Sequence, residues 1–156
     1  MQANLNENNI YIDGSCLKNP GKGGSAMIQL INEKRVIVFS EHFQETTNNR
    51  CELSALILAL NINIKNKIIF SDSLYVVNGY NNWIHNWVRN NWKNSQKHDV
   101  LNSDLWKEIL QLKNINSDTT IKWVKAHYIN KYNNLCDKFA KEAANNITYN
   151  GKEFDI

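Results

Sequence analysis

The sequence predicts an α/β fold: a mixed five-stranded sheet with helices on both faces. Three observations support it: apolar strands joined by a tight polar turn, a helical pattern before another buried strand, and a final strand followed by a helix. The chain has 156 residues, of which 42% are hydrophobic and 21% charged, values typical of a single globular domain.

The N-terminal part favours antiparallel strands. Residues 10–13 predict a first strand that ends in a glycine-rich turn running through Gly24. Two more strands, over 25–31 and 35–43, are joined by the polar turn 32–34. Hairpins of this kind are antiparallel, so the first part of the sheet is expected to be an antiparallel hairpin motif.

A helix and a parallel strand come next. The pattern becomes helical from Thr47 to about Asn61, with one apolar face formed by Leu53, Leu56, Ile57 and Leu60. Residues 67–71 then predict a strand buried on both faces. A crossover helix between two strands implies that they pair in parallel.

The C-terminal half is mainly helical. Residues 73–80 predict a short helix that stops near Gly79. Residues 83–113 predict one or more helices with a break around 95–102. The last two elements are a strand and a helix, at residues 119–124 and 133–145.

Composition excludes several classes of protein. No apolar segment reaches the roughly 18 residues of a membrane span, and the first residues do not resemble a signal peptide. The three cysteines, Cys16, Cys51 and Cys136, have no CxxC spacing, which argues against a disulfide scaffold or a structural zinc site and suits the cytoplasm. The net charge of +3 permits a nucleic-acid partner without requiring one.

Four carboxylates lie at positions that suit a shared site. Asp13 and Asp72 each close an apolar strand, so parallel pairing would bring both to one edge of the sheet. Glu52 and Asp137 each border the apolar face of a helix. A single aspartate at a strand end is more often a turn former or helix cap, so the prediction depends on the set.

Four acids in one site would repel one another unless a cation compensates their charge. Ligand sets made only of oxygen favour Mg²⁺ or Mn²⁺ over zinc. Two such ions roughly 3.5–4 Å apart can activate a water and stabilise the leaving oxygen of a phosphodiester.

Four sequence blocks resemble type 1 ribonuclease H of the bacterial ribonuclease HI kind, in the same order and spacing: YIDGSCLKNPGKGG (11–24), TTNNRCELSA (46–55), SDSLYV (71–76) and WVKAH…CDKFA (123–140). The resemblance implies a ribonuclease H-like fold. Its catalytic domain would span 9–147 with a helical basic protrusion at about 81–102, between a short flexible N-terminus (1–8) and a C-terminal tail (148–156).

The resemblance also implies an activity. The chain would be an endoribonuclease that hydrolyses the RNA strand of RNA–DNA hybrids by two-metal-ion catalysis, leaving 5′-phosphate and 3′-hydroxyl ends. Two Mg²⁺ ions, with Mn²⁺ as a substitute, would be held by Asp13, Glu52, Asp72 and Asp137. His127 matches a loop histidine that assists turnover or product release; the alternative is an ordinary surface histidine.

Substrate contacts follow from the same resemblance. Along the RNA minor groove it places Cys16, Asn19, Asn48 and Glu52, with Asn49 at the neighbouring groove edge. A pocket for a DNA phosphate would be formed by Thr47, Asn48 and Asn102. Cys16 and Cys136 could equally be small core residues, and for Cys136 that interpretation is preferred.

The protrusion interleaves aromatic and basic residues, a combination that suits a DNA strand. Its tryptophans are Trp83, Trp87 and Trp92, and its basic residues are Arg89, Lys93 and Lys97. Packing between helices is at least as good an explanation for Trp87 and Trp92, whereas Trp83 is the better candidate for touching DNA.

Two other function classes stay open at this point. One is a hybrid-binding module without catalysis, and the other is a resolvase or integrase, which shares the acidic cluster but not the Thr-Asn-Asn-Arg block. The expected partner is an RNA–DNA hybrid duplex, with no membrane, and the expected oligomeric state is a monomer. A single-stranded-DNA-binding or replication partner cannot be read from the sequence.

Overall fold

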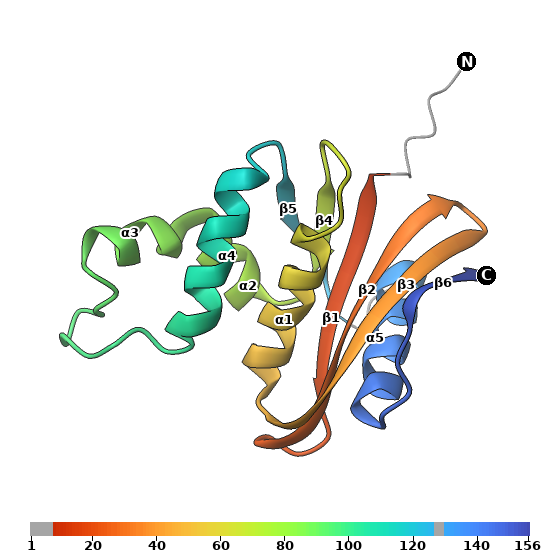
Figure 1. The fold of residues 1–156 in the computed structure, drawn as a ribbon, viewed down its shortest axis with the longest axis horizontal. Coiled ribbons are helices and arrows are strands. Elements are labelled where there is room, and N and C mark those ends of the chain that lie inside the picture. The colour runs from red at the N-terminus through yellow and green to blue at the C-terminus, as the bar shows by residue number, and fades with distance from the viewer. Residues whose placement is uncertain (1–7, 127–129) are drawn as a thin grey trace.

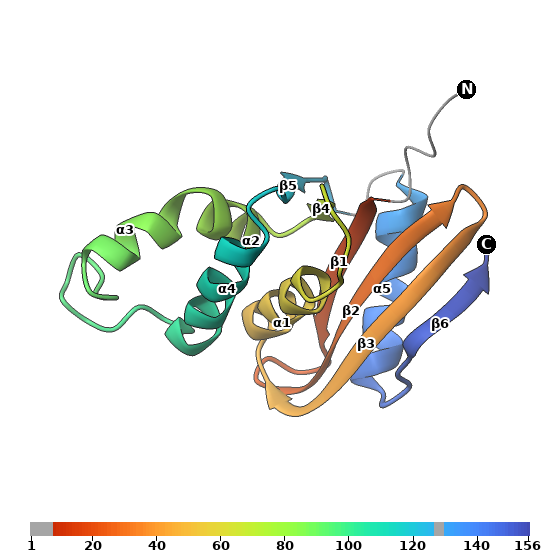
Figure 2. The ribbon, with the colours of Figure 1, turned by 45° about the horizontal axis from the view of Figure 1, so that its top comes forward.

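The computed structural model describes residues 8–126 and 130–156, which build a six-stranded sheet covered by helices (Figure 1, Figure 2). In chain order the elements are β1 (Asn9–Cys16), β2 (Gly21–Asn32), β3 (Arg35–Thr46), α1 (Asn48–Leu60), β4 (Ile68–Ser71), α2 (Leu74–Asn78), the π-helical turn η1 (Gly79–Trp83), α3 (Ile84–Arg89), α4 (Ser103–Ile115), β5 (Thr120–Trp123), α5 (Lys131–Ala144) and β6 (Asn150–Asp155).

The sheet is mixed, as predicted, with the strand order β5-β4-β1-β2-β3-β6. Strands β1, β2 and β3 pair antiparallel, while β4 and β5 run parallel to β1. The described chain has six strands rather than the predicted five, because β6 adds to the free edge of β3 as an antiparallel strand. The fold class is confirmed, and the strand count is corrected.

The predicted turn through Gly24 is wrong, because Gly23 and Gly24 belong to β2. Both glycines allow close packing. A Cβ on Gly24 would lie 2.3 Å from the backbone nitrogen of Ala144 in α5, and one on Gly23 would lie 2.7 Å from the sulfur of Cys51 in α1. The glycines let helices approach both faces of the strand, and the actual turn covers residues 17–20.

Two apolar clusters lie on the two faces of the sheet. One joins α1 and α4 to the strands through residues such as Ile12, Leu56 and Ile109. The other joins α5 to the opposite face through Ile28 and Phe139. Figure 2 shows α1 and α5 on opposite sides of the sheet. Helices on both faces are therefore confirmed.

Gly79 does not stop the helix, contrary to the prediction. The chain continues from α2 through η1 into α3. Gly79 instead lies against Trp106, since a Cβ there would be 2.2 Å from the indole ring. The predicted break between the later helices is present but longer, because α3 ends at Arg89 and α4 begins at Ser103.

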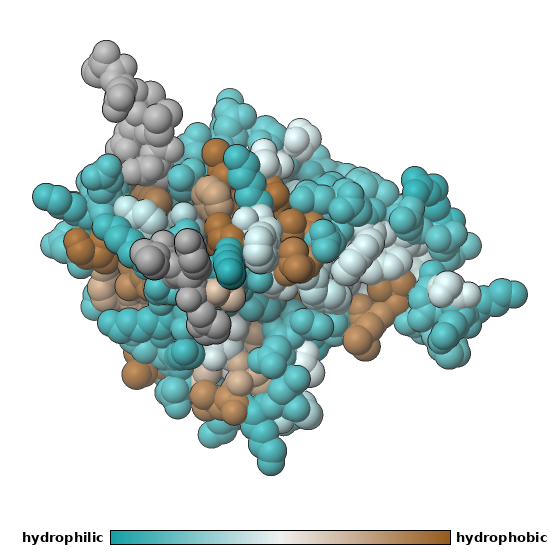
Figure 3. Space-filling model, turned by 180° about the vertical axis from the view of Figure 1, so that it is seen from behind, coloured by the Kyte–Doolittle hydropathy of each residue, from teal (hydrophilic) through white to brown (hydrophobic). Residues whose placement is uncertain are grey.

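The surface seen from behind is mostly hydrophilic, with hydrophobic residues in small separate groups (Figure 3). Within the described ranges, none of the helices has both the length and the apolar character that a membrane crossing requires.

Candidate active site

Asp13 lies in β1 and is almost completely buried, with 4% of its surface exposed. Its Oδ1 accepts a hydrogen bond of 2.9 Å from the backbone N–H of Gly14. A Cβ on Gly14 would lie 2.5 Å from the backbone nitrogen of Glu52. The absence of a side chain at Gly14 therefore lets α1 approach β1 closely enough to bring Glu52 to Asp13.

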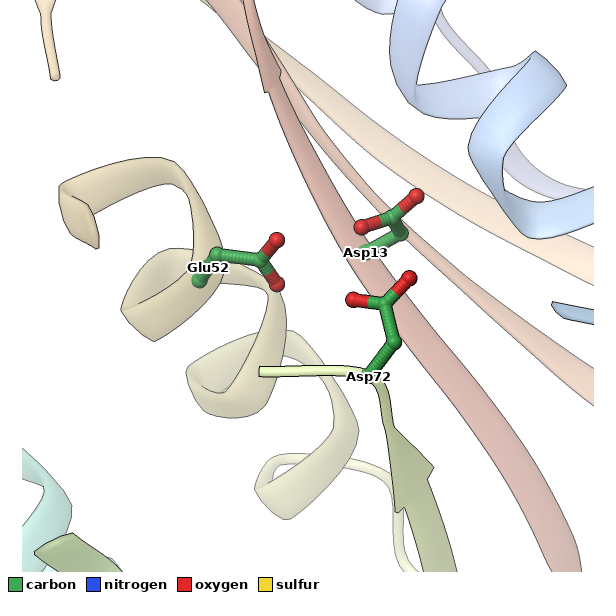
Figure 4. A group of neighbouring side chains, drawn as sticks. All are labelled: Asp13, Glu52 and Asp72. Carbon is green, nitrogen blue, oxygen red and sulfur yellow. The ribbon is translucent and has the colours of Figure 1, made fainter. Parts of the chain in front are cut away.

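Glu52 and Asp72 complete a group of three acids. Thr47 starts α1 because its hydroxyl accepts a hydrogen bond from the backbone N–H of Arg50 at 3.3 Å. Asp72 directly follows β4, and its carbonyl accepts a 3.2 Å hydrogen bond from the Trp123 indole. The carboxylates of Asp13, Glu52 and Asp72 point toward one another (Figure 4), with ligand oxygens all within 4.8 Å.

Asp137 comes from α5 and borders the same site. It lines a cavity of about 230 Å³ together with the three acids; the other lining residues are Gly14, Ala126, Asn133 and Asn134. Asp137 is outside the group whose oxygens lie within 4.8 Å. Its Oδ2 lies 2.8 Å from the Nζ of Lys141. The fold thus brings together all four predicted acids, three of them tightly.

The electrostatics of the site disfavour bare negative charge. Burial, followed by the nearby charge of Asp72, raises the pKa of Asp13 to about 8. Burial and the charges of Asp13 and Asp72 raise the pKa of Glu52 well above its usual value. Glu52 Oε2 has no hydrogen-bond partner among the described residues. A bound cation would remove both the repulsion and the unpaired oxygen.

Asn133 is a further residue of the site, and the sequence pattern did not predict it. It lies in α5 with only 2% of its surface exposed, and its Nδ2 donates a 3.3 Å hydrogen bond to Asp72 Oδ2. Its Oδ1 is buried and has no hydrogen-bond partner among the described residues. The available signal was its position four residues before Asp137, which places both residues on one helix face.

The residues predicted to grip a DNA phosphate lie around the start of α1. Arg50 connects them, because its backbone is capped by Thr47 and its Nη1 donates to Asn102 Oδ1 at 3.4 Å. Arg50 also forms a bidentate ion pair with Asp104, with Nη1–Oδ1 and Nη2–Oδ2 distances of 2.9 and 2.8 Å. The backbone N–H of Asn48 donates a 3.1 Å hydrogen bond to Asn19 Oδ1, which connects the loop after β1 to the start of α1.

The remaining residues predicted to contact RNA lie nearby. Cys16 is partly exposed, and its thiol donates to the carbonyl of Lys18 at 2.9 Å. Asn49 is exposed in the first turn of α1. Cys136 is fully buried where α5 packs against β1 and β2, with its sulfur 3.4 Å from the carbonyl of Tyr11, so the core interpretation of Cys136 is confirmed.

The tryptophans of the protrusion form a row of aromatic contacts. Trp87 lies at the centre, with ring centroids 6.1 Å from Trp83, 6.2 Å from Trp92 and 5.2 Å from Trp106. Trp87 and Trp92 are half-buried and pack against neighbouring aromatic rings, which agrees with the packing interpretation. Trp83 is 38% exposed. Lys93 pairs with Asp99, which offsets part of the basic charge predicted there.

His127, predicted to assist turnover, lies outside the described residues.

Comparison with known proteins gives one consistent result. The family described as RNase H matches residues 6–145. Ribonuclease H of Acetivibrio thermocellus is 45% identical over 139 residues, covering 85% of this chain and 91% of the relative.

Two solved structures are also similar. LC9-RNase H1, described as a type 1 RNase H with the type 2 active-site motif, has a TM-score of 0.79 and 26% identity over 95% of this chain and 76% of its own. LC11-RNase H1 in complex with RNA/DNA hybrid has a TM-score of 0.64 and is 21% identical, and the match covers 88% of this chain and 96% of that one. At this identity the similarity shows the fold alone. The clustered acids, the sheet that positions them and these matches lead to one conclusion: the chain is a ribonuclease H enzyme that belongs to the RNase H family, among its type 1, bacterial HI-like members.

Proposed function

We propose that this chain is an endoribonuclease that hydrolyses the RNA strand of RNA–DNA hybrids with two divalent ions, Mg²⁺ in the cell, and leaves 5′-phosphate and 3′-hydroxyl ends. One observation carries the proposal: the oxygens of Asp13, Glu52 and Asp72 lie within 4.8 Å of one another, in a cavity that Asp137 also lines. The 45% identity with Ribonuclease H of Acetivibrio thermocellus supports the proposed class of activity.

The residues of the cavity fit a divalent ion of the hard, oxygen-preferring kind. The four acids offer only oxygen ligands, which suits Mg²⁺ or Mn²⁺ better than zinc. The raised pKa of Asp13 and the unpaired Oε2 of Glu52 are the features expected where a cation normally balances buried acids. Within the described residues, the acids and Asn133 are held by three different elements and a strand end, so their positions are largely set before an ion binds.

In the proposed mechanism, Asp13, Glu52, Asp72 and Asp137 hold the ions. The ions would supply an activated water nucleophile and stabilise the leaving 3′ oxygen of the phosphodiester. Asn133 orients the carboxylate of Asp72 through its hydrogen bond, and Trp123 fixes the backbone of Asp72. We assign His127 to turnover or product release.

Hybrid recognition would use two sides of the site, because only an RNA–DNA duplex offers 2′-hydroxyls on one strand and a deoxy backbone on the other. The RNA side is assigned to Cys16, Asn19, Asn48 and Asn49, with Glu52 at the cleavage site. The DNA side is assigned to Thr47, Asn48 and Asn102 for a phosphate, and to Trp83 and Lys93 of the protrusion. We place the enzyme in the cytoplasm as a monomer.

A cleavage assay tests the proposal. The protein, freed of metal with chelator, is mixed with an end-labelled RNA–DNA hybrid, an RNA duplex or a DNA duplex, with Mg²⁺ or with chelator. We expect cleavage of the RNA strand of the hybrid alone, only with Mg²⁺, and mass spectrometry of the fragments should find 5′-phosphate and 3′-hydroxyl ends. Asp13→Asn should cut roughly 10²–10³-fold more slowly or worse, the scale of losing one group that stabilises transition-state charge.

The matched control is Asp155→Asn, the same chemical change at an exposed position in β6, which should cleave at the wild-type rate. A fully active Asp13→Asn enzyme would contradict the assigned site. Binding of the hybrid without cleavage would indicate a recognition module, and cleavage of the DNA duplex would indicate a resolvase or integrase activity.

A further inference from the structure

Asp137 differs from the other three acids in its surroundings. It is 32% exposed at the side chain, and its Oδ2 is held by Lys141, one helical turn further along α5, at 2.8 Å. The pair is an i,i+4 ion pair with the acid toward the helix N-terminus, the favourable order.

The pair lies between two cavities. Asp137 lines the acidic cavity, and it also lines a neighbouring groove of about 740 Å³ along α5, whose other residues are Lys138, Lys141, Glu142, Asn145 and Ile147. The side chain of Lys141 is 60% exposed, so it reaches Asp137 from the solvent side. Asp137 is thus held at the wall of the acidic cavity by a cation of the chain itself.

This arrangement separates the four acids into two groups. Asp13, Glu52 and Asp72 converge without Asp137, so they can hold one ion while the Asp137–Lys141 pair stays intact. Oδ2 of Asp137 is already in contact with the Lys141 amine, so an ion that binds Asp137 must either displace that amine or share the carboxylate with a neighbouring positive charge. In both cases the cost falls on the ion that uses Asp137 and not on the other.

We infer that Lys141 is a positioning residue that restrains Asp137 and selectively weakens the binding of the second divalent ion. The inference rests on the proposed function, since it assumes that the acids hold two ions. Its consequence is that a variant without the amine binds the second ion more tightly, while the affinity for the first ion is nearly unchanged.

Titration calorimetry of the full, metal-free chain with Mn²⁺, without substrate, tests this. Lys141→Gln should tighten the weaker of the two binding events by roughly fivefold, the upper end of the effect of one exposed ion pair that no longer competes for Asp137, and change the tighter event by less than about twofold. Because Lys141 is exposed, the variant should fold normally, which circular dichroism checks. Lys138→Gln is the matched control: it removes the same charge from the next position after Asp137, outside the ion pair, and should change both events by less than about twofold.

Asp137→Asn provides a second control, because Lys141→Gln added to it should have no further effect if the lysine acts through Asp137. Equal tightening by Lys138→Gln and Lys141→Gln would overturn the inference in favour of long-range charge. Unchanged or weaker binding of the second ion in Lys141→Gln would overturn it too. A wild-type chain that binds no Mn²⁺ would refute the proposed function, and with it the inference, whereas two ions bound with no effect of Lys141 would refute the inference alone.

Discussion

Asp13 is buried beside the carboxylates of Glu52 and Asp72, so its negative charge is costly when no cation is bound. In the folded chain the pKa of Asp13 is raised to about 8, while in the unfolded chain it would ionise near its usual 3.8. Between these values the folded state holds a proton that the unfolded state has lost. The contribution of Asp13 to stability therefore decreases as the pH rises from about 4 to about 8.

Because the ionised Asp13 side chain destabilises the metal-free fold, Asp13→Asn should change stability: it removes the charge with little change of shape. In chelator at pH 8 the variant should be more stable than wild type by about 1–3 kcal/mol, and at pH 4 the two should be close. Urea unfolding at both pH values measures the difference, with Asp155→Asn as the control. An Asp13→Asn variant that is no more stable than wild type at pH 8 would show that the acids do not strain the metal-free fold.

The two aspartates that follow apolar segments were the most predictable part of the site, although Asp13 lies inside β1 and does not close the strand as predicted. Asp13 and Asp72 follow apolar segments, and the parallel pairing of β1 with β4 brings them side by side. Asn133 was not predictable in the same way. An asparagine near the start of a helix is usually exposed, and this one is buried only because α5 packs against the sheet beside Asp72.

At the scale of elements, the connection from α2 to α3 depends on Gly79. Sequence rules treat glycine as a helix stop, because they consider the backbone of one segment only. Here the reason for glycine is the indole of Trp106, which occupies the space where a Cβ would lie, and which also donates a 2.9 Å hydrogen bond to the hydroxyl of Tyr75. The contact between Gly79 and Trp106 joins residues 27 positions apart, so a local pattern could not reveal it.

Gly79→Ala separates these two explanations. Helix propensity alone predicts a more stable protein, since alanine is favoured over glycine within a helix. The clash with Trp106 predicts a loss of about 1–3 kcal/mol in the free energy of unfolding, as in other overpacked cores. Urea denaturation measures the change, and Asn82→Ala, an exposed position in the same π-helical turn, should change stability by less than about 0.5 kcal/mol. A stabilised Gly79→Ala protein would contradict the packing role.

At the scale of the whole molecule, the sheet brings distant segments to one cavity. The strand order puts β1 between β2 and β4, α1 covers one face, and α5 covers the other (Figure 1). Hydrophobic patterning predicted a mixed sheet with helices on both faces, but it gave neither the order of the strands nor β6. That strand contains a single large apolar residue, Phe154. Residues 150–155 pair with the free edge of β3, and the Phe154 ring packs against Phe139 with ring centroids 5.0 Å apart.

The most direct test of the shared cation site is anomalous diffraction from crystals of the protein grown with an RNA–DNA hybrid and soaked in Mn²⁺. We expect two manganese peaks roughly 3.5–4 Å apart, bound by oxygens of Asp13, Glu52, Asp72 and Asp137. Crystals that show no manganese in the cavity, or whose carboxylate oxygens are too far apart to bind the same ions, would contradict it.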